Sequence, residues 1–459
     1  MVEVRTAHKL APRGSLGYDS LMSSRTYFKG KRIAVIGLGV HGEMLADIAF
    51  LIRSGAVVAV YDLRSEARLK DYIMALRSVG LISYVCGSIP PDDLLDVDMI
   101  ILSHEYSKGS SFLEPARRAH VPVEYPETIF FKIAPAVTVV GIIGSAGKST
   151  VMSMLVPMLE SVCGTDKGQR LYVIDHESDK GVLAQLPRMK SADVVVVRIE
   201  SDILFELHAA RMSPYVAILT TVPRGNYSKS PFEILSYQTY NNFVVANDEV
   251  IDAIHADGFH IKAKMFRTKL TSLLSDWHFK GNGSHDRENA ALAIEAASIL
   301  KVPRETIRTV LEKWKPLKGR LELVRKVKQI EFYNDTASVV SLATEKAVQV
   351  LVEQRNLVLI FGGVETGDDH RKLYTLLPDA VHTIVLVPGS GTLRTRSTIE
   401  ALEYISVHSV PSIEEAVYRA LECAKKGDRI VFSPGFPAGG FDLSRQERGE
   451  RFVRVVKEL

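Results

Sequence analysis

Two short segments of this 459-residue chain carry the residue types that bind phosphate groups. One follows the apolar run 137–143 and precedes a helical pattern, and it reads GSAGKST. In such a loop the backbone N–H groups surround phosphates, the lysine reaches the β- and γ-phosphates, and the next hydroxyl contacts Mg²⁺. Glycine is usual where Ile142 stands, so this is the variant GxxGKST. We expect an ATP and Mg²⁺ site at Gly144, Ser145, Ala146, Gly147, Lys148, Ser149 and Thr150.

The other segment is a glycine loop near the N-terminus. A predicted strand leads into Gly37-x-Gly39-x-x-Gly42, a helix follows, and a second strand ends at Asp62, 20 positions after Gly42. Glycines at these positions allow a tight turn and a close approach to phosphate, and the acid can bind a ribose hydroxyl or a base. NAD, FAD and a UDP-sugar all suit this geometry, so the ligand stays open at this point.

A third glycine pair follows the predicted strand Leu357–Phe361. Gly362 and Gly363 lie where α/β proteins bind ligands, at the carboxyl end of a strand. Two glycines alone are weak evidence for a site, and we favour a plain turn.

Strands and helices alternate along the chain and must position these loops. Most of the predicted strands are wholly apolar, which is typical of strands covered on both faces. Their alternation with helices predicts an α/β fold with parallel sheets. The predicted strands are Ile33–Ile36, Val57–Tyr61, Met99–Leu102, Val137–Ile143, Val194–Ile199, Tyr215–Leu219, Phe243–Ala246, Leu357–Phe361, Thr383–Val387 and Ile430–Phe432. The predicted helices are Glu43–Arg53, Ser149–Val162, Asn289–Leu300 and Ser412–Lys425.

Length and composition limit the class of protein. The length predicts about three domains, and we place them at 29–135, 136–316 and 317–459, after an N-terminal extension, 1–28. The net charge of +3 gives no reason to expect a nucleic-acid partner. Three cysteines without a CxxC motif suit a reducing compartment, and no apolar run reaches the roughly 18 residues of a membrane span. We therefore expect a cytoplasmic protein without membrane insertion.

A nucleotide-binding fold, a P-loop and a third α/β fold together suit an enzyme that binds a nucleotide-linked substrate and consumes ATP. From about Lys31 to Leu459 the chain resembles the Mur ligases, and most closely their D-glutamate-adding branch. The resemblance is carried by GLGVHG, YDLR, GSAGKST, HDRENAALAIEAA, GRLELV, NDTAS, FGG and SPG…RQERGERF. It implies a Rossmann-like domain for the UDP-substrate, a central ATPase domain, and a Rossmann-like C-terminal domain that brings in the amino acid.

The resemblance also implies a reaction and its residues. The carboxylate of a UDP-N-acetylmuramoyl-L-alanine-like precursor attacks ATP, and the resulting acyl phosphate is captured by an amino acid, in peptidoglycan synthesis. We expect a monomer. Ser149 and Glu200 would bind the metal, and Lys148 and Glu200 would act in catalysis. The other implied contacts are Asn289, Arg320 and Asp335 for ATP, and Val40, His41, Asp62 and Arg64 for the UDP group. A solvated acid at Glu200 and a turn-shaping Asp335 are the alternative interpretations, and we expect His285 to be structural.

Several positions depart from the family pattern. Neutral residues stand where a histidine and a lysine would hold a second metal, at Asn226 and Gln238. Lysines and D-glutamate contacts of the C-terminal domain are replaced at Ala337, Thr366, Ala438 and Asp442. These departures leave the added amino acid and the number of metals open, and they motivate an alternative, a Mur-like protein that binds nucleotide without ligation. An NAD-linked oxidoreductase would leave the P-loop unused, and folylpolyglutamate-type ligases lack the domain that begins with 31–102.

Overall fold

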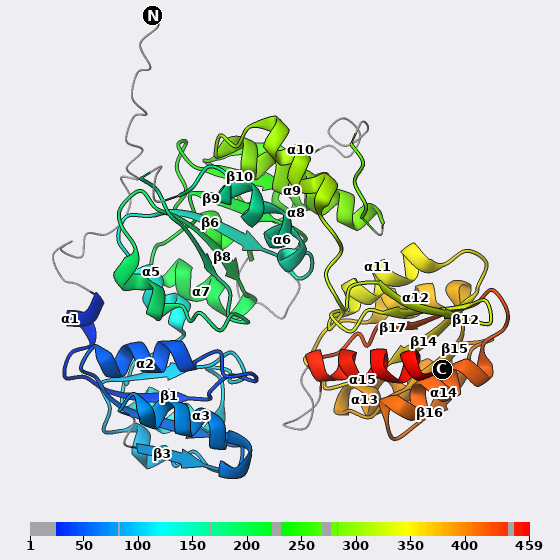
Figure 1. The fold of residues 1–459 in the computed structure, drawn as a ribbon, viewed down its shortest axis with the longest axis horizontal. Helices are drawn as coiled ribbons and strands as arrows, with labels where there is room; N and C mark the ends of the chain where they lie inside the picture. The colour runs from blue at the N-terminus through cyan, green and yellow to red at the C-terminus, as the bar shows by residue number, and fades with distance from the viewer. Residues whose placement is uncertain are drawn as a thin grey trace, which may run out of the picture.

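The computed structural model describes residues 24–80, 83–164, 168–222, 231–268, 277–281, 283–438 and 445–459. Its strands form three sheets, each with helices around it, that follow one another along the chain (Figure 1). Every strand pair is parallel except one hairpin in the third sheet. This architecture confirms the predicted α/β fold class. The described helices include none with the length and apolarity of a membrane span.

The first sheet has the strand order β3-β2-β1-β4-β5. Its strands are β1 (Arg32–Ile36), β2 (Val57–Asp62), β3 (Ser83–Cys86), β4 (Met99–Leu102) and β5 (Val123–Glu124). Its helices are α1 (Ser24–Phe28), α2 (Leu45–Arg53), α3 (Glu66–Ser78), α4 (Glu114–Arg118) and α5 (Pro126–Ile133), with 3₁₀ turns at Pro91–Leu94 and Ser111–Leu113. Helix α1 falls within the range predicted as an extension, yet Phe28 is fully buried, with its ring centroid 5.8 Å from that of Phe50. The packed structure therefore begins before residue 29.

The second sheet has the order β11-β10-β9-β6-β8-β7, which puts the strand that precedes the P-loop in the interior. Its strands are β6 (Thr138–Ile143), β7 (Leu171–Ile174), β8 (Val194–Ile199), β9 (Val216–Leu219), β10 (Phe243–Ala246) and β11 (Lys264–Arg267). Its helices are α6 (Lys148–Glu160), α7 (Ser201–Ala209), α8 (Asp248–Ala256), α9 (Ser284–Ile299) and α10 (Arg304–Lys313). Two 3₁₀ helices, η4 (Leu183–Arg188) and η5 (Pro231–Leu235), complete this part.

The third sheet has the order β12-β13-β17-β14-β15-β16, with β12 and β13 antiparallel. Its strands are β12 (Glu322–Val327), β13 (Ile330–Asn334), β14 (Leu357–Phe361), β15 (Val381–Leu386), β16 (Ser406–Ser409) and β17 (Arg429–Phe432). Its helices are α11 (Ser341–Leu351), α12 (Arg371–Ala380), α13 (Ser390–Glu400), α14 (Ile413–Cys423) and α15 (Arg445–Glu458).

One apolar core joins the first sheet to the second. The cluster that contains β1 and α2 residues continues without a break into β8, η4 and α7. Across this junction the Asp47 carboxylate of α2 accepts bonds from the backbone N–H groups of Val182 (3.0 Å) and Ala184 (2.9 Å). The third sheet is packed by clusters of its own. The first two sheets thus form one packed unit.

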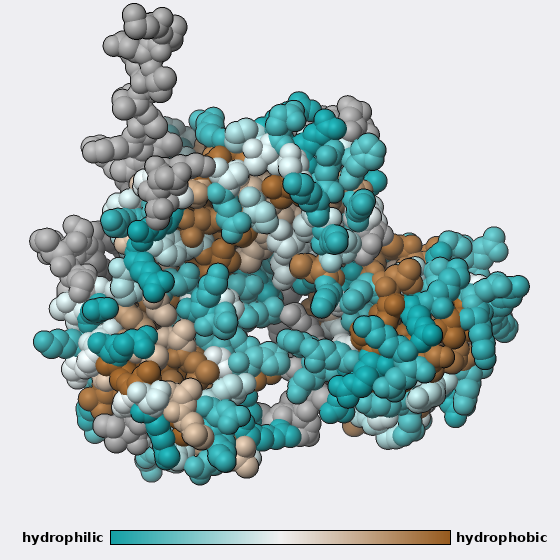
Figure 2. Space-filling view, in the orientation of Figure 1, coloured by the Kyte–Doolittle hydropathy of each residue, from teal (hydrophilic) through white to brown (hydrophobic). Residues whose placement is uncertain are grey.

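The outer surface is mainly hydrophilic. Figure 2 shows apolar residues in separate patches on a largely hydrophilic face. The most exposed large apolar side chains come from helix α13 and from two turns, and they are Leu393, Tyr404 and Tyr240. Such scattered exposure is usual and marks no docking surface.

Candidate active site

The P-loop forms a tight turn between β6 and α6. Lys148 is the first residue of α6, and Gly147 before it has φ +88°. A Cβ at Gly147 would lie 2.5 Å from the Asn289 side-chain oxygen of α9, so the turn requires glycine. The N–H groups of Ser145 and Ala146 donate to the Thr221 hydroxyl at 3.0 and 3.1 Å. A bound phosphate would have to compete with the Thr221 hydroxyl for these two N–H donors. The sequence pattern did not reveal Thr221.

Lys148 and Glu200 form an ion pair at this loop. The Lys148 Nζ lies 3.1 Å from Glu200 Oε2 and donates to the Gly144 carbonyl at 2.6 Å. The Lys148 side chain is only 9% exposed, so its ammonium group is in contact with the protein and little hydrated. Glu200 follows β8, whose neighbour β6 leads into the loop. The structure thus brings together Lys148 and Glu200, as the sequence predicted.

The electrostatics of this pair follow from burial and from neighbouring charges. Burial lowers the pKa of Lys148, although Glu200 opposes the effect. Burial alone would raise the pKa of Glu200, but Lys148 and Arg198 outweigh it and hold that pKa well below its ordinary value. Glu200 therefore carries its charge between Lys148 and Arg198, and its role in catalysis stays a prediction.

The donor set suits a hard divalent cation. Ser149 offers a hydroxyl at the start of α6, and Glu200 offers a carboxylate at the end of the adjoining strand. Mg²⁺ prefers six oxygen ligands and binds through few protein groups together with substrate phosphates. Ser149 and Glu200 would hold such an ion with ATP phosphates and water.

The remaining predicted ATP residues lie around the same loop or at the next joint. Asn289 contacts Gly147, as described above. Arg320, in the turn before β12, acts electrostatically on Lys148 and on Asp335. Asp335 is buried. Its Oδ1 accepts a hydrogen bond from the N–H of Leu321 (3.0 Å), and its Oδ2 accepts one from the Ser433 hydroxyl (2.6 Å). Burial raises the pKa of Asp335 to about 6. Asp335 therefore fixes the start of the third sheet, and its contact with ATP stays a prediction.

The N-terminal glycine loop is folded as the sequence predicts. Gly37, Gly39 and Gly42 have φ values between +82° and +84°. Asp62 accepts from the N–H of Leu38 at 3.1 Å. It also accepts from Arg64 Nε at 2.9 Å. These contacts join the end of β2 to the loop.

Arg64 lies across this loop. Its NH2 donates to the Gly39 carbonyl at 3.0 Å, and its NH1 to the Val40 carbonyl at 3.4 Å. Burial would lower the pKa of Arg64, but the bond with Asp62 and the charge of Glu105 raise it. Arg64 thus holds a positive charge at the glycine loop.

Glu43 is a loop contact that the sequence pattern did not reveal. Its Oε2 accepts from the N–H of His41 at 2.9 Å, so an internal carboxylate satisfies a donor of the glycine loop. Nothing in the motif identifies Glu43, because the position after the third glycine is variable in the pattern GxGxxG.

Comparison with known proteins shows that the chain is similar to one family of ligases. Residues 319–436 match the family described as "Mur ligase, glutamate ligase domain". A "UDP-N-acetylmuramoylalanine--D-glutamate ligase" of Roseiflexus sp. (strain RS-1) is 28% identical over 473 residues, covering 94% of this chain and 99% of the relative. A protein of the same name from Clostridioides difficile (strain 630) is 26% identical, with the same coverage. The chain carries a Mur ligase C-terminal domain and is similar over nearly its whole length to these ligases.

Solved structures agree with this chain in fold. A UDP-N-acetylmuramate-alanine ligase from Thermotoga maritima has a TM-score of 0.58 at 16% identity, covering 93% of this chain and 99% of that chain. A MurF ligase from Thermotoga maritima in complex with ADP has a TM-score of 0.53 at 15% identity, covering 95% and 96%. Such distant likeness shows the three-domain fold alone.

One predicted substitution is wrong in its placement. Gln238 is buried and donates to the carbonyls of Pro214 (2.8 Å) and Phe243 (3.2 Å), which lie at the beginnings of β9 and β10. These strands run parallel to β6, with Val216 opposite Val140, so Gln238 lies at the sheet edge remote from the P-loop. Gln238 therefore does not replace a metal-holding lysine. Asn226 and Asp442 lie outside the described residues.

The C-terminal positions have no lysine at the predicted places. Ala337 donates its N–H to the Gly319 carbonyl at 2.9 Å, and Thr366 is exposed. Ala438 is half-buried. The nearest loop acid, Glu365, is paired with Arg394. These positions therefore offer no lysine to a substrate carboxylate.

The glycine pair after β14 is explained by packing. Gly363 has φ +154°, and a Cβ there would lie 2.2 Å from the Pro437 carbonyl. We expect Gly363→Ala to lower the free energy of unfolding by more than about 3 kcal/mol, because the clash is with rigid backbone. Gly367→Ala is the matched control, since Gly367 has φ +80° but nothing within 4 Å of a Cβ, and only about 1–2 kcal/mol of strain applies. Equal shifts of Tm in the two variants would show that the contact with Pro437 is unimportant.

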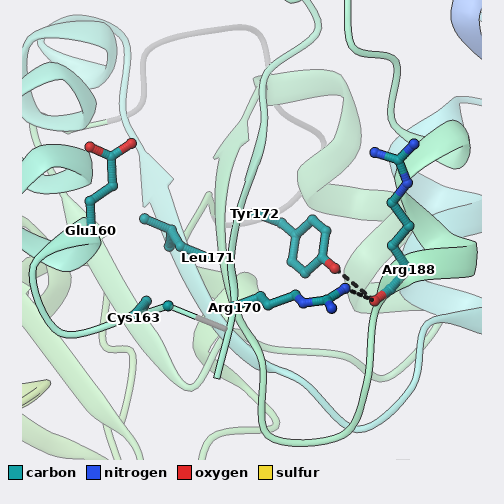
Figure 3. A pocket seen from close by; sticks show the side chains of 7 residues that line it. Glu160, Cys163, Arg170, Leu171, Tyr172 and Arg188 are labelled. Atoms are coloured by element: carbon teal, nitrogen blue, oxygen red, sulfur yellow. Dashed lines mark hydrogen bonds between the residues drawn. The ribbon is translucent and has the colours of Figure 1, made fainter. Parts of the chain in front are cut away.

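A shallow pocket of about 390 Å³ lies at the edge strand β7, away from the P-loop. Figure 3 shows Arg170 and Tyr172 pointing at the Arg188 carbonyl, to which both donate. The other lining residues are Glu160, Cys163, Gly164 and Leu171. Because the pocket lies beside the beginning of β7, at the sheet edge opposite to the P-loop, it adds no group to the nucleotide site.

Proposed function

We propose that this chain is a Mur ligase that joins an amino acid to a UDP-N-acetylmuramoyl-L-alanine-like precursor in peptidoglycan synthesis, with hydrolysis of ATP to ADP and phosphate. The main support is the buried ion pair between Lys148 and Glu200 at the P-loop. The domain with this pair packs as one unit with the glycine-loop domain, in which Arg64 lies across the loop. A phosphate-activating site and a nucleotide-type site are both used by such a reaction. The names of the relatives from Roseiflexus and Clostridioides support the same activity and favour D-glutamate as the amino acid.

The reaction proceeds in two transfers. A carboxylate oxygen of the precursor forms a bond to the γ-phosphorus of ATP while the bond from that phosphorus to the bridging oxygen breaks, and ADP leaves. The amine of the amino acid then attacks the acyl carbon, the bond to phosphate breaks, and the amine loses a proton. Lys148 stabilises the negative charge of the transferred group, since such transfers depend mainly on positioning and charge. Bound Mg²⁺ would neutralise phosphate charge.

The finer assignments are part of the same proposal. The precursor's UDP group is placed at Gly37, Gly39, Val40, His41, Gly42, Asp62 and Arg64, and ATP at the P-loop with Asn289, Arg320 and Asp335. Domain boundaries near Ala136 and Leu317, a cytoplasmic location and a monomeric state complete it. The absence of lysine at Ala337 and Thr366 allows another amino acid than D-glutamate.

Release of phosphate tests this function directly. The purified chain is incubated with ATP, MgCl₂, UDP-N-acetylmuramoyl-L-alanine and each amino acid in its D and L forms. We expect phosphate and ADP in equal amounts only when precursor and one amino acid are both present, with D-glutamate as the first candidate. Omission of the precursor is the control. No release with any amino acid would favour the nucleotide-binding protein without ligase activity.

A further inference from the structure

Arg198 is a buried cation beside the P-loop. It lies on β8 opposite Ile142 of β6, the strand that leads into the loop. Its side chain is only 9% exposed. A buried guanidinium needs acceptors on several sides, because it carries five N–H donors and stays protonated.

Three carboxylates surround Arg198. Its Nε donates to Glu200 Oε1 at 2.7 Å, and its NH1 lies 3.1 Å from Glu177 Oε2 and 3.4 Å from Asp175 Oδ1. Asp175 and Glu177 follow β7, so the acids come from the carboxyl ends of two adjacent strands. The other oxygen of Glu200 faces Lys148. One carboxylate is therefore shared by the phosphate lysine and the arginine.

Carboxylates beside transferring phosphates commonly hold divalent ions, in some enzymes two of them about 4 Å apart. Here the guanidinium nitrogens already contact oxygens of Glu200, Glu177 and Asp175. A divalent ion bound among these three acids would have to expel a buried arginine and leave its charge without partners, at a cost of several kcal/mol. The space is filled by a cation that belongs to the protein.

We propose that Arg198 is a built-in cation of the nucleotide site, which occupies the space among Glu200, Glu177 and Asp175 where a second divalent ion could otherwise bind, so that one divalent ion per nucleotide suffices. The inference rests on the proposed function, because it requires a nucleotide at the P-loop. Arg198 is a positioning residue: it acts through Glu200, which it holds next to Lys148.

Counting bound Mn²⁺ tests the proposal without catalysis. The full chain is saturated with the non-hydrolysable analogue AMPPNP, and bound Mn²⁺ is measured by electron paramagnetic resonance. We expect one Mn²⁺ per bound AMPPNP, and two would overturn the inference while leaving the proposed function intact. Failure to bind AMPPNP would overturn both. This count uses the unaltered protein and so does not depend on the folding of a variant.

Chemical rescue distinguishes a required charge from mere support of the fold. We expect R198A to lower the rate of ADP formation at least 100-fold. Millimolar guanidinium should then raise the rate of the variant at least tenfold, because it can enter the vacated space. R188A removes an exposed arginine of the same domain and should show neither effect. An R198A variant that keeps half of the activity, or one that guanidinium fails to improve, would overturn the role of Arg198 as a cation.

Discussion

Lys148→Ala is expected to lower ATP-dependent ligation by roughly a thousandfold or more. Lys148 is the first residue of α6, and the αL geometry of Gly147 directs it back over the loop. In the structure its ammonium bridges the Gly144 carbonyl and Glu200. A γ-phosphate bound at the loop would compete for this ammonium, so removal of Lys148 takes a buried charge from the point where negative charge must be stabilised.

The measurement is ADP formed per minute with precursor and amino acid at saturation. Lys190→Ala is the control, since Lys190 is exposed on the same domain and contacts no part of the loop. Circular dichroism and Tm should be compared, because Lys148→Ala also leaves Glu200 with Arg198 as its remaining strong partner. Unchanged activity in a folded Lys148→Ala variant would contradict the assignment of the P-loop as the ATP site.

Local patterns were sufficient to locate both loops, and the family resemblance added Glu200 and Asn289, but two other residues beside the P-loop were not found. The P-loop and the glycine loop are continuous segments whose turns need glycine, so the motif contains most of their geometry. Arg198 and Thr221 reach the P-loop only because β8 and β9 flank β6 in the sheet. An arginine in an otherwise apolar strand was the available signal, since an unpaired charge in a buried strand is costly.

The predicted strands are those of the sheet interiors. All ten correspond to observed strands, while the six edge strands of the three sheets, β3, β5, β7, β11, β12 and β16, were not predicted. Edge strands are half-exposed, as in Glu322–Val327 and Ser406–Ser409, and so lack the continuous apolar run on which the prediction relied. The strand Ile330–Asn334 was also missed, because its buried residues alternate with the half-buried Glu331 and Tyr333 and form no continuous apolar run.

The error at Gln238 has a different cause. Its place was inferred by counting from β9 through a connection of variable length, where a few residues more or less change the sheet edge that a residue reaches. The structure shows Gln238 in the turn after η5, where its amide joins the beginnings of two strands. Counting is reliable within an element but not across a loop.

Asp47→Asn is expected to give no gain in the free energy of unfolding at pH 5 and to raise that free energy at pH 8. Asp47 lies fully buried at the junction of the first two sheets, where it accepts from Val182 and Ala184. Burial raises the pKa of Asp47 to about 7, although the two N–H bonds oppose the rise. A Cβ on Gly181 would lie 2.4 Å from its Oδ1, so the carboxyl has little room to move away.

A carboxyl whose pKa is higher in the folded chain stabilises the fold fully only below the pKa of the unfolded chain. That contribution is lost as the pH rises through the folded pKa, and for Asp47 the whole loss is roughly 4 kcal/mol. About 2–3 kcal/mol of it falls between pH 5 and pH 8. The asparagine variant keeps a carbonyl acceptor and does not ionise, so it should be no more stable than the wild type at pH 5 and more stable at pH 8.

Urea unfolding of both proteins at the two pH values measures this difference, and the comparison cancels other groups that titrate in the same range. Asp248→Asn, at an exposed carboxyl of α8, reports the general effect of removing one negative charge. A variant that is destabilised equally at pH 5 and pH 8 would show that Asp47 stays in one ionisation state. The crossover would instead show that the unit formed by the first two sheets loosens as the pH rises through neutrality, because the carboxyl that joins them becomes charged while it remains buried.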